Sequence, residues 1–310
     1  MARPQRIIDA HHHLWDLGAS HRYPWLMEKG IVRFFGNPAP IQHDYLVTNF
    51  RKDIGDIPVT ASVHIQVGVA PGDEVAETQW LQQQQEAHGL PSAVVAFCDL
   101  TAPDLAASLD THQQSALLRG VRQIVGSSAE EDRRTGSGGL LGDPCFLTGL
   151  HGLAERELSF DLQLIPAQME RASQLFASVP ELRVALCHAG SLSDFSVDGC
   201  ALWQRGIRLL AQLPNMICKF SGFGMFNKNW SAHSVREQFD IIVDVFGPRR
   251  IAFGSNFPVD KLAMSYDHVW QHFFDLTQAF ADDEIASMYH DTAAHFYRIP
   301  EAPNPHFFRG

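Results

Sequence analysis

The sequence predicts one α/β domain in which eight parallel strands close into a (β/α)8 barrel. Three observations indicate this fold class. Eight short segments rich in Val, Ile, Leu and Phe recur along the 310 residues without strict polar–apolar alternation. Amphipathic segments of helical length separate them. The length suits a single barrel, which commonly has about 250 residues and more with insertions. We therefore treat residues 1–310 as one domain.

The apolar segments have the length and composition of strands that are buried on both faces of a parallel sheet. We expect the strands at residues 6–9, 62–66, 93–99, 120–125, 159–164, 183–188, 216–221 and 250–255. An open, doubly wound sheet is the alternative arrangement. It is disfavoured because no Gly-x-Gly-x-x-Gly pattern follows the first strand.

The segments between the strands have helical periodicity, and several end at residues that stop helices. Gly89 follows the first segment, Pro214 follows the fifth, and Gly247 follows the sixth. We expect helices at residues 73–88, 104–118, 144–158, 166–179, 202–213, 234–246, 266–280 and 282–297.

Two stretches do not fit this alternation, and we expect long loops there. Residues 18–51, after strand one, have no long period, and residues 126–144, after strand four, are rich in Gly, Ser and charge. Both would lie on the face where barrel active sites are built, and long loops there often act as lids. A disordered loop is the alternative for the second stretch.

The composition excludes several classes of partner. With 24 Lys and Arg against 35 Asp and Glu, the net charge is −11, and no basic stripe is available for nucleic acid. No run of about 18 apolar residues predicts a membrane span. The five cysteines are scattered and form no Cys-x-x-Cys pair, and no apolar signal region precedes the first strand. These features are typical of reduced thiols in a cytoplasmic protein. A homo-oligomer is left open.

Asp9 and three consecutive histidines lie at the end of the first predicted strand. Side chains alternate along a strand, so we expect Asp9, His11 and His13 on one face and His12 on the other. Two imidazoles two residues apart on one face can converge on a divalent cation. Hydrogen-bonded core histidines are the alternative.

Polar side chains lie at or near the carboxyl ends of the other strands as well. They are His64, Gln66, Asp99, Arg122, Gln123, Gln163, His188, Lys219, Ser221, Asn256 and Asp260. In a closed parallel barrel these ends meet around one mouth. Buried polar and charged groups are costly unless they are paired, so the whole set favours a functional pocket. A structural polar role is the alternative for any single member, such as His64 or Gln163.

Taken in order, these stretches resemble the amidohydrolase superfamily. The resemblance is to a branch of TIM-barrel hydrolases that includes sugar-acid lactonases (L-fuconolactonase and L-rhamnonolactonase), 2-pyrone-4,6-dicarboxylate lactonase and 4-sulfomuconolactone hydrolase. The matching stretches are residues 8–15, 23–26, 120–123, 160–164, 187–190, 219–222 and 253–259. They extend over nearly the whole chain.

The resemblance implies a distorted (β/α)8 TIM barrel with one catalytic centre. It assigns His11 and His13 as ligands of a divalent ion, zinc or manganese, with His188 as a third ligand or a substrate contact. It places the general base at the end of strand eight. Members of this branch differ in whether they need a metal, so metal-free operation stays open.

The chain departs from this pattern at strand eight, where Asn256 replaces the usual Asp. A neutral amide cannot act as a general base near neutral pH. Either Asp260 supplies the carboxylate, or His188 takes the proton, or the reaction differs. A surface ion pair with Lys261 is the alternative for Asp260.

Arg122 and Lys219 are candidates for binding a substrate anion, because a guanidinium can hold a carboxylate in two places. Pairing with Asp99 or another buried carboxylate is the alternative. We also expect Gln163 and His64 to contact the substrate. The aromatic residues Trp25, Phe35 and Trp230 either line the pocket or pack under long loops.

We therefore expect metal-assisted hydrolysis of a lactone of a sugar acid or of a carboxylated aromatic-degradation intermediate. The substrate would be small and anionic or polyhydroxylated. Non-oxidative decarboxylation of an aromatic acid is the second expectation. A catalytically silent barrel that binds a metabolite is the third.

Overall fold

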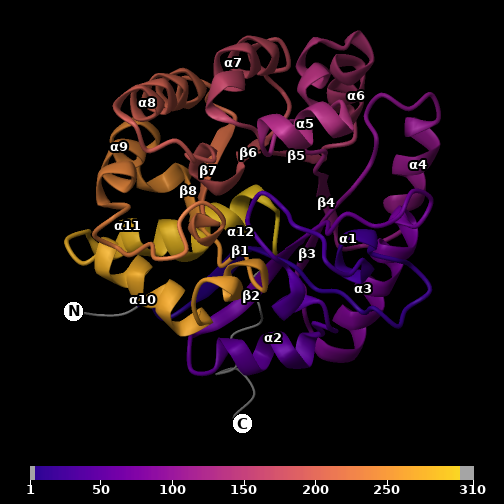
Figure 1. The fold of residues 1–310 in the computed structure, drawn as a ribbon, viewed down its shortest axis with the longest axis horizontal. Coiled ribbons are helices and arrows are strands. Elements are labelled where there is room, and N and C mark those ends of the chain that lie inside the picture. Colours follow the sequence, from indigo (N-terminus) through magenta and orange to yellow (C-terminus); the bar gives the residue numbers. More distant parts are fainter. Residues whose placement is uncertain (1–3, 301–310) are drawn as a thin grey trace.

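A computed structural model describes residues 4–300 of the chain, and its centre is a sheet of eight parallel strands in sequential order (Figure 1). The strands are β1 (Ile7–His12), β2 (Val59–Ile65), β3 (Ala93–Ala96), β4 (Leu118–Val121), β5 (Ser159–Leu162), β6 (Val184–Leu186), β7 (Met216–Phe220) and β8 (Ile251–Phe253). The segment after β8 returns to β1, where Asn256 N donates to His11 O and His13 N donates to Phe257 O, both at 2.7 Å. This contact nearly closes the sheet, and the predicted (β/α)8 TIM barrel is confirmed.

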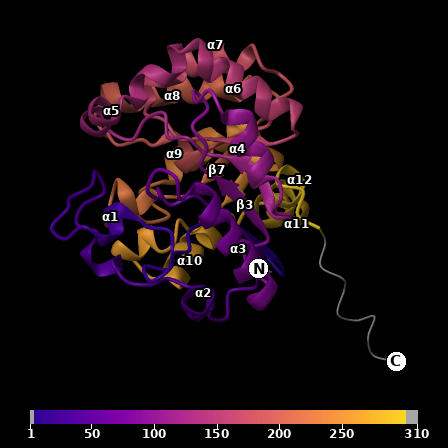
Figure 2. The same cartoon turned by 90° about the vertical axis from the view of Figure 1, so that its right-hand side faces the viewer.

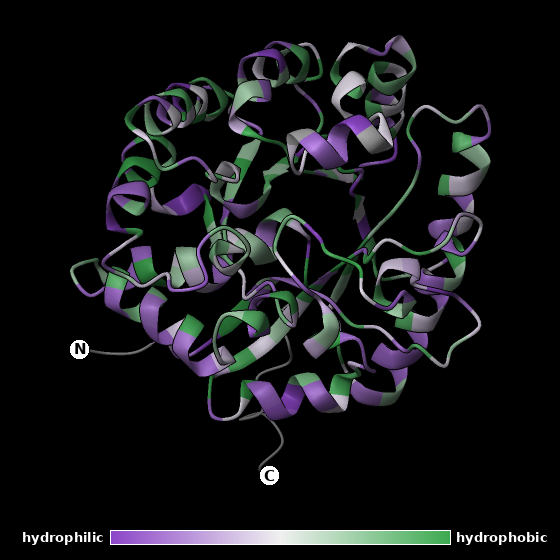
Figure 3. Ribbon diagram, viewed as in Figure 1, coloured by the Kyte–Doolittle hydropathy of each residue, from purple (hydrophilic) through white to green (hydrophobic). Residues whose placement is uncertain are grey.

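Helices lie around the strands and at the two ends of the barrel (Figures 1 and 2). They are α1 (Pro24–Met27), α2 (Val47–Ile54), α3 (Glu74–His88), α4 (Leu105–His112), α5 (Ala129–Thr135), α6 (Pro144–Glu155), α7 (Met169–Ala177), α8 (Val197–Ala211), α9 (Arg236–Phe246), α10 (Tyr266–Leu276), α11 (Asp282–Ala286) and α12 (Thr292–Phe296). Green hydrophobic and purple hydrophilic residues occur together on these helices (Figure 3). Amphipathic helices with a buried apolar side are typical of this outer ring.

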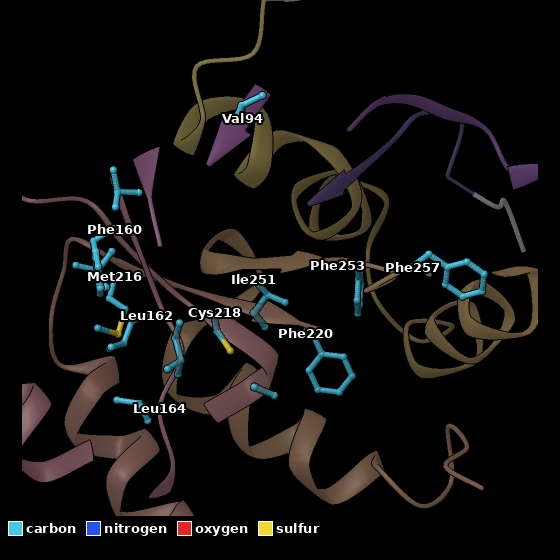
Figure 4. Close-up of a cluster of buried hydrophobic side chains, with 14 of the residues drawn as sticks. Val94, Phe160, Leu162, Leu164, Met216, Cys218, Phe220, Ile251, Phe253 and Phe257 are labelled. Carbon is cyan, nitrogen blue, oxygen red and sulfur yellow. The ribbon is translucent and has the colours of Figure 1, made fainter. Parts of the chain in front are cut away.

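The strands separate two apolar cores. Inside the barrel, small and branched residues such as Val63 and Ala185 form one cluster. Between strands and helices, larger residues such as Phe160, Met216 and Phe253 form the other (Figure 4). Alternation along each strand assigns neighbouring residues to opposite cores, which explains why the strands are apolar throughout.

The two ends of the barrel differ. At the amino end of the strands, Arg183 Nη1, just before β6, donates to Phe296 O of α12 at 3.0 Å. The segments around α1 and α5 lie at the opposite end from α12 (Figure 2). The carboxyl ends of the strands, where the predicted site residues lie, are therefore covered by the long connections after β1 and β4.

Several strands end earlier than predicted. The chain leaves β3 at Ala96, β4 at Val121, β6 at Leu186 and β8 at Phe253. After β6 and β8 it turns through left-handed backbone, as at His188 with a φ of 54°. The polar residues that we expected at the ends of these strands therefore lie in the connections that follow the strands, at the carboxyl end of the barrel.

Both predicted long loops contain short helices. Residues 18–51 contain α1 and the start of α2, and residues 126–144 contain α5 and a 3-10 turn over Ser137–Gly142. These helices are too short for a periodic pattern to be recognised. The N-cap residue Ser128 was a sequence signal for the start of α5, and its Oγ accepts a hydrogen bond from Glu131 N.

Other helix bounds also differ from the prediction. The helix predicted at 202–213 begins at Val197, after the cap residue Ser196, and the one predicted at 104–118 ends at His112. The last predicted helix is divided into α11, a π-helical turn over Ser287–Asp291, and α12. All five cysteines are free. In the part of the chain that the structure describes, no helix is long and apolar enough to cross a membrane.

Candidate active site

A cavity of about 630 Å³, including the open space at its mouth, lies over the carboxyl ends of the strands. Eight of the residues that the sequence analysis named for the pocket line it. They are His13, Trp25, Phe35, Gln66, Arg122, Gln163, His188 and Asn256. Because these residues directly follow β1, β2, β4 and β5 or lie in the connections after β1, β6 and β8, only the closed barrel brings them together.

The end of β1 is irregular, which corrects one prediction. The pairing of β1 with β2 shifts register between Asp9 and His12. Asp9 lies toward the helical layer, where Ser255 Oγ donates to Asp9 Oδ2 at 2.6 Å and the hydroxyl of Tyr266, in α10, donates to it at 3.0 Å. Asp9 therefore does not share a face with His11 and His13, because the shift interrupts simple alternation.

His12 points away from the cavity, as predicted. Its ring stacks on Phe50 of α2, with the ring centroids 4.1 Å apart and the planes 8° from parallel. The structure therefore makes His12 a packing residue of the outer core.

Three other imidazoles converge. The His11 ring centroid lies 4.5 Å from that of His188 and 5.2 Å from that of His13. His13 Nδ1 donates to Ile65 O at 2.7 Å, and His188 Nδ1 lies 3.1 Å from Ser221 Oγ. These contacts fix the orientations of the two rings that line the cavity.

The surroundings keep these imidazoles neutral. Burial lowers the pKa of His11, His13 and His188 well below the ordinary histidine value. The positive charges of Lys219, near His11, and Arg122, near His13 and His188, lower the pKa values further. The three imidazoles are therefore neutral, and each has a lone pair on one ring nitrogen.

The donors do not form a complete set of metal ligands as they are arranged. His13 Nδ1 donates to Ile65 O, so the neutral ring presents the lone pair of Nε2, which lies 3.3 Å from the acceptor Asn256 Oδ1. His11 has no hydrogen-bond partner for either ring nitrogen. Within residues 4–300, no group of three His, Cys, Asp or Glu residues is placed to hold a metal ion. Asn256 also takes the place of the usual strand-eight carboxylate, so that position offers a neutral amide instead of an anionic ligand. The ligand role of the histidines stays a prediction.

Arg122 is the charged group at the bottom of the cavity, and its residue is only 5% exposed. Nη1 donates to Gln163 Oε1 at 3.0 Å, and Nη2 donates to Gln66 O at 2.6 Å. The buried Nε has no hydrogen-bond partner among the described residues. The partners are a neutral amide and a carbonyl, so this guanidinium has no carboxylate within ion-pair distance in the described chain.

Asn256 and Asp260 form a pair beside the cavity. Asn256 Nδ2 donates to Asp260 Oδ1 at 2.9 Å, and Gly224 N donates to Asp260 Oδ2 at 3.2 Å. Asp260 is buried, and Lys261 pairs with Asp53 at 2.8 Å, so the alternative of a surface pair with Lys261 is wrong. Burial raises the pKa of Asp260 to about 7. The carboxyl contacts Asn256, which lines the cavity, but is not itself a lining residue.

Lys219 and His64 are brought to the site but do not line it. Lys219 is fully buried inside the barrel, where it pairs with Asp161 and donates to Ala10 O at 3.2 Å. This is the structural pairing that the sequence left as an alternative, although Asp161 was not the named partner. His64 lies in β2, and its Nδ1 accepts a hydrogen bond from Leu14 N at 3.1 Å.

The mouth of the cavity contains residues that the sequence did not single out. Arg33 lies over the ring of Trp25, 5.4 Å from its centroid, and pairs with Glu131 of α5 at 2.9 Å. Phe35 lines the cavity as expected, whereas Trp230 does not and packs against Phe223. No sequence signal marked Arg33, because it lies in an irregular segment.

Comparison with known proteins agrees with the barrel fold. A family model described as amidohydrolase matches residues 8–299. An uncharacterized protein of Sinorhizobium fredii, y4mH, is 38% identical over 94% of this chain and 98% of its own length. An L-fucono-1,5-lactonase of Burkholderia multivorans is 28% identical over 95% of this chain and 96% of its own length. These matches cover essentially the whole barrel.

A solved structure has the same fold. The crystal structure of an amidohydrolase from Burkholderia multivorans with bound zinc superimposes with a TM-score of 0.80. The two sequences are 27% identical, and the match covers 95% of this chain and 99% of the other. The predicted resemblance is therefore confirmed at the level of family and fold.

Proposed function

The chain belongs to the amidohydrolase family, and we propose that it hydrolyses the lactone of a sugar acid or a similar polyhydroxylated or carboxylated lactone. Similarity to an L-fucono-1,5-lactonase supports this substrate class. The single observation that carries the proposal is Arg122, a buried guanidinium without an anionic partner that lines the cavity.

Arg122 supplies hydrogen-bond donors for the negatively charged group of the substrate or of the reaction intermediate. Gln163 Oε1 and Gln66 O hold two of its five N–H groups and fix the plane of the guanidinium. The remaining N–H groups can bind a substrate carboxylate or the oxyanion that develops on a lactone carbonyl. Such donors act strongly because they are already oriented in a buried site.

His188 is the group that we assign to the proton transfers. Its Nδ1 contact with Ser221 orients the ring, and its neutral state allows Nε2 to accept a proton from water. The water oxygen bonds to the lactone carbonyl carbon, and the carbonyl oxygen becomes an oxyanion beside Arg122. The ring C–O bond then breaks, and the imidazolium returns the proton to the departing alkoxide, which gives the hydroxy acid.

Asn256 and the aromatic residues position the substrate. Asp260 accepts from Asn256 Nδ2 and so holds the Asn256 amide at the cavity wall, where it can hydrogen-bond a hydroxyl. Trp25 Nε1 donates to Val67 O at 2.7 Å, which fixes an indole ring that can pack against the apolar face of a sugar ring. Asp260 acts here as a positioning residue.

The test is acid release, followed with a pH indicator, from a panel of aldono-1,4-lactones, aldono-1,5-lactones and carboxylated pyrone lactones. We expect turnover of at least one of these lactones by the wild type. Carbon dioxide release from hydroxybenzoates without lactone turnover would favour decarboxylation instead. A melting shift with a lactone but no turnover of any substrate would favour a silent binding barrel. Either result would overturn the proposal.

A further inference from the structure

A second cavity adjoins the one described above, on the side of β3, β4 and α5. The two cavities share five lining residues, among them Arg33, Gln66 and Ser127. The second is lined further by polar residues at the ends of β3 and β4, including Asp99, Thr101 and Gln123. It is therefore continuous with the Arg122 cavity but has a different chemical character.

Asp99 is a charged residue that lines this second cavity and not the first. Its Oδ1 accepts three hydrogen bonds, from Thr101 N at 3.0 Å, Thr101 Oγ1 at 2.7 Å and Gln123 Nε2 at 3.0 Å. Gln123 is itself fixed, because its Oε1 accepts from Leu100 N at 3.0 Å. Asp99 Oδ2 accepts no hydrogen bond from the residues that the structure describes. One oxygen thus holds the carboxylate in place and the other remains available.

The Arg33–Glu131 ion pair lies where the two cavities meet. Both side chains are largely buried, with 19% and 13% exposed, and both line the second cavity. Glu131 offsets the charge of Arg33. The cationic group without an anionic partner, Arg122, lines only the first cavity, and the carboxylate Asp99 lines only the second. An anionic substrate group is favoured in the first cavity and disfavoured in the second.

We propose that the second cavity binds the hydroxylated chain that substitutes the lactone ring of the substrate, with Asp99 Oδ2 accepting hydrogen bonds from its hydroxyls. A carboxylate suits neutral hydroxyl donors and repels carboxylate or phosphate substituents. The inference deepens the proposed function and depends on it for the identity of the ring. It makes Asp99 a specificity-determining residue that distinguishes substituted from unsubstituted lactones.

Asp99→Asn tests this with little structural change. The amide oxygen can keep the bonds from Thr101 and Gln123, while the available acceptor is replaced by a donor. The matched control is Asp104→Asn, which removes the same charge from an exposed residue outside the cavity. Ser137→Phe, which places a bulky ring in the lining of the second cavity, is an independent variant.

The substrates are glucono-1,4-lactone, whose ring carries a two-carbon hydroxylated chain, and threono-1,4-lactone, whose ring does not. We expect Asp99→Asn to lower kcat/KM for the first about tenfold, through KM, the scale of one lost charge-assisted hydrogen bond. The second should change less than about twofold, and Asp104→Asn should change neither. Equal effects on both lactones, or no effect of Asp99→Asn on either, would overturn the inference.

A binding measurement keeps the inference testable apart from the proposed function. If the wild type hydrolyses neither lactone, calorimetric titration with gluconate replaces the rates. Binding about tenfold weaker in Asp99→Asn than in the wild type and in Asp104→Asn would support the second cavity even if the proposed reaction failed. Equal affinities, or no binding to the wild type, would overturn it. Thermal melting identifies a variant that does not fold. If Asp99→Asn does not fold, the same comparison is made with Ser137→Phe.

Discussion

Replacing Arg122 by Met removes the guanidinium from the cavity while keeping an unbranched side chain of similar length. In the wild type, two N–H groups bind Gln163 Oε1 and Gln66 O, and Nε has no partner among the described residues. We therefore expect Arg122→Met to abolish the hydrogen bonds from residue 122 to the substrate carboxylate or oxyanion, while the histidines keep their positions.

The expected size follows from the N–H groups that remain for the substrate. Three of the five are not used by Gln163 or Gln66, which allows a two-point contact with a carboxylate or oxyanion. Two hydrogen bonds to a charged group correspond to about 3–4 kcal/mol, or roughly a 10²–10³-fold loss in kcat/KM. Arg122→Lys keeps the positive charge but not the planar guanidinium, so its kcat/KM should lie between the values for Arg122→Met and the wild type.

The assay is the initial rate of acid release at several lactone concentrations, with the melting temperature measured on the same samples. The matched control is Arg119→Met, in β4 three residues before Arg122, because Arg119 donates to Ala116 O and Leu118 O outside the cavity. Removing a costly buried charge offsets the two lost hydrogen bonds, so we expect similar melting temperatures for Arg122→Met and the wild type. A folded Arg122→Met variant with wild-type kcat/KM would refute the reasoning.

Three further predictions follow from the site. His188→Gln should lower kcat by roughly 10²–10⁴-fold with little change in KM, as expected for loss of a general base, and a wild-type kcat would remove His188 from the mechanism. Gly254→Ala should lower activity and the melting temperature, because the new Cβ would lie 2.7 Å from His11 Cβ, whereas Gly139→Ala, with no atom within 4 Å, should change neither. Burial raises the pKa of Asp260 from 3.8 to about 7. The folded state therefore favours the protonated carboxyl. The stability that this group contributes is fully present below pH 3.8 and is lost as the pH rises through 7, where the buried carboxyl ionises. The melting temperature of Asp260→Asn relative to the wild type should therefore rise between pH 4 and pH 8, by the equivalent of up to about 4 kcal/mol, and a constant difference would contradict this.

The barrel and eight residues of its cavity were predictable because they depend on local and repetitive signals. Apolar strands, helical spacing and polar strand ends are each visible in a short window, and barrel closure then places the ends together. His13, Arg122 and Gln163 reach the cavity for this reason.

The errors concern features that depend on distant parts of the chain. The register shift after Asp9 is set by the pairing of β1 with β2, so simple alternation placed Asp9 on the wrong face. The partner of Lys219 is Asp161, 58 residues away, and no spacing indicates that ion pair. Arg33 reaches the mouth of the cavity through its contacts with Trp25 and Glu131 in tertiary structure.

The position of Asp260 shows a limit of a different kind. Its spacing of four residues from Asn256 suggested a displaced base, and the two side chains do meet. The amide, however, lies toward the cavity and the carboxyl lies behind it. Which of two adjacent polar groups faces the substrate depends on the turn after β8, where Asn256 has a φ of 55°.

The central claim is that His188 and Arg122 carry out the proposed lactone hydrolysis, in which no step is routed through a metal ion. The most direct measurement is the rate of acid release from an aldonolactone by enzyme dialysed against a chelator, with the metal content of the same sample determined. We predict the same kcat before and after chelation and no increase on adding Zn²⁺ or Mn²⁺. Loss of activity on chelation that zinc or manganese restores would contradict the account.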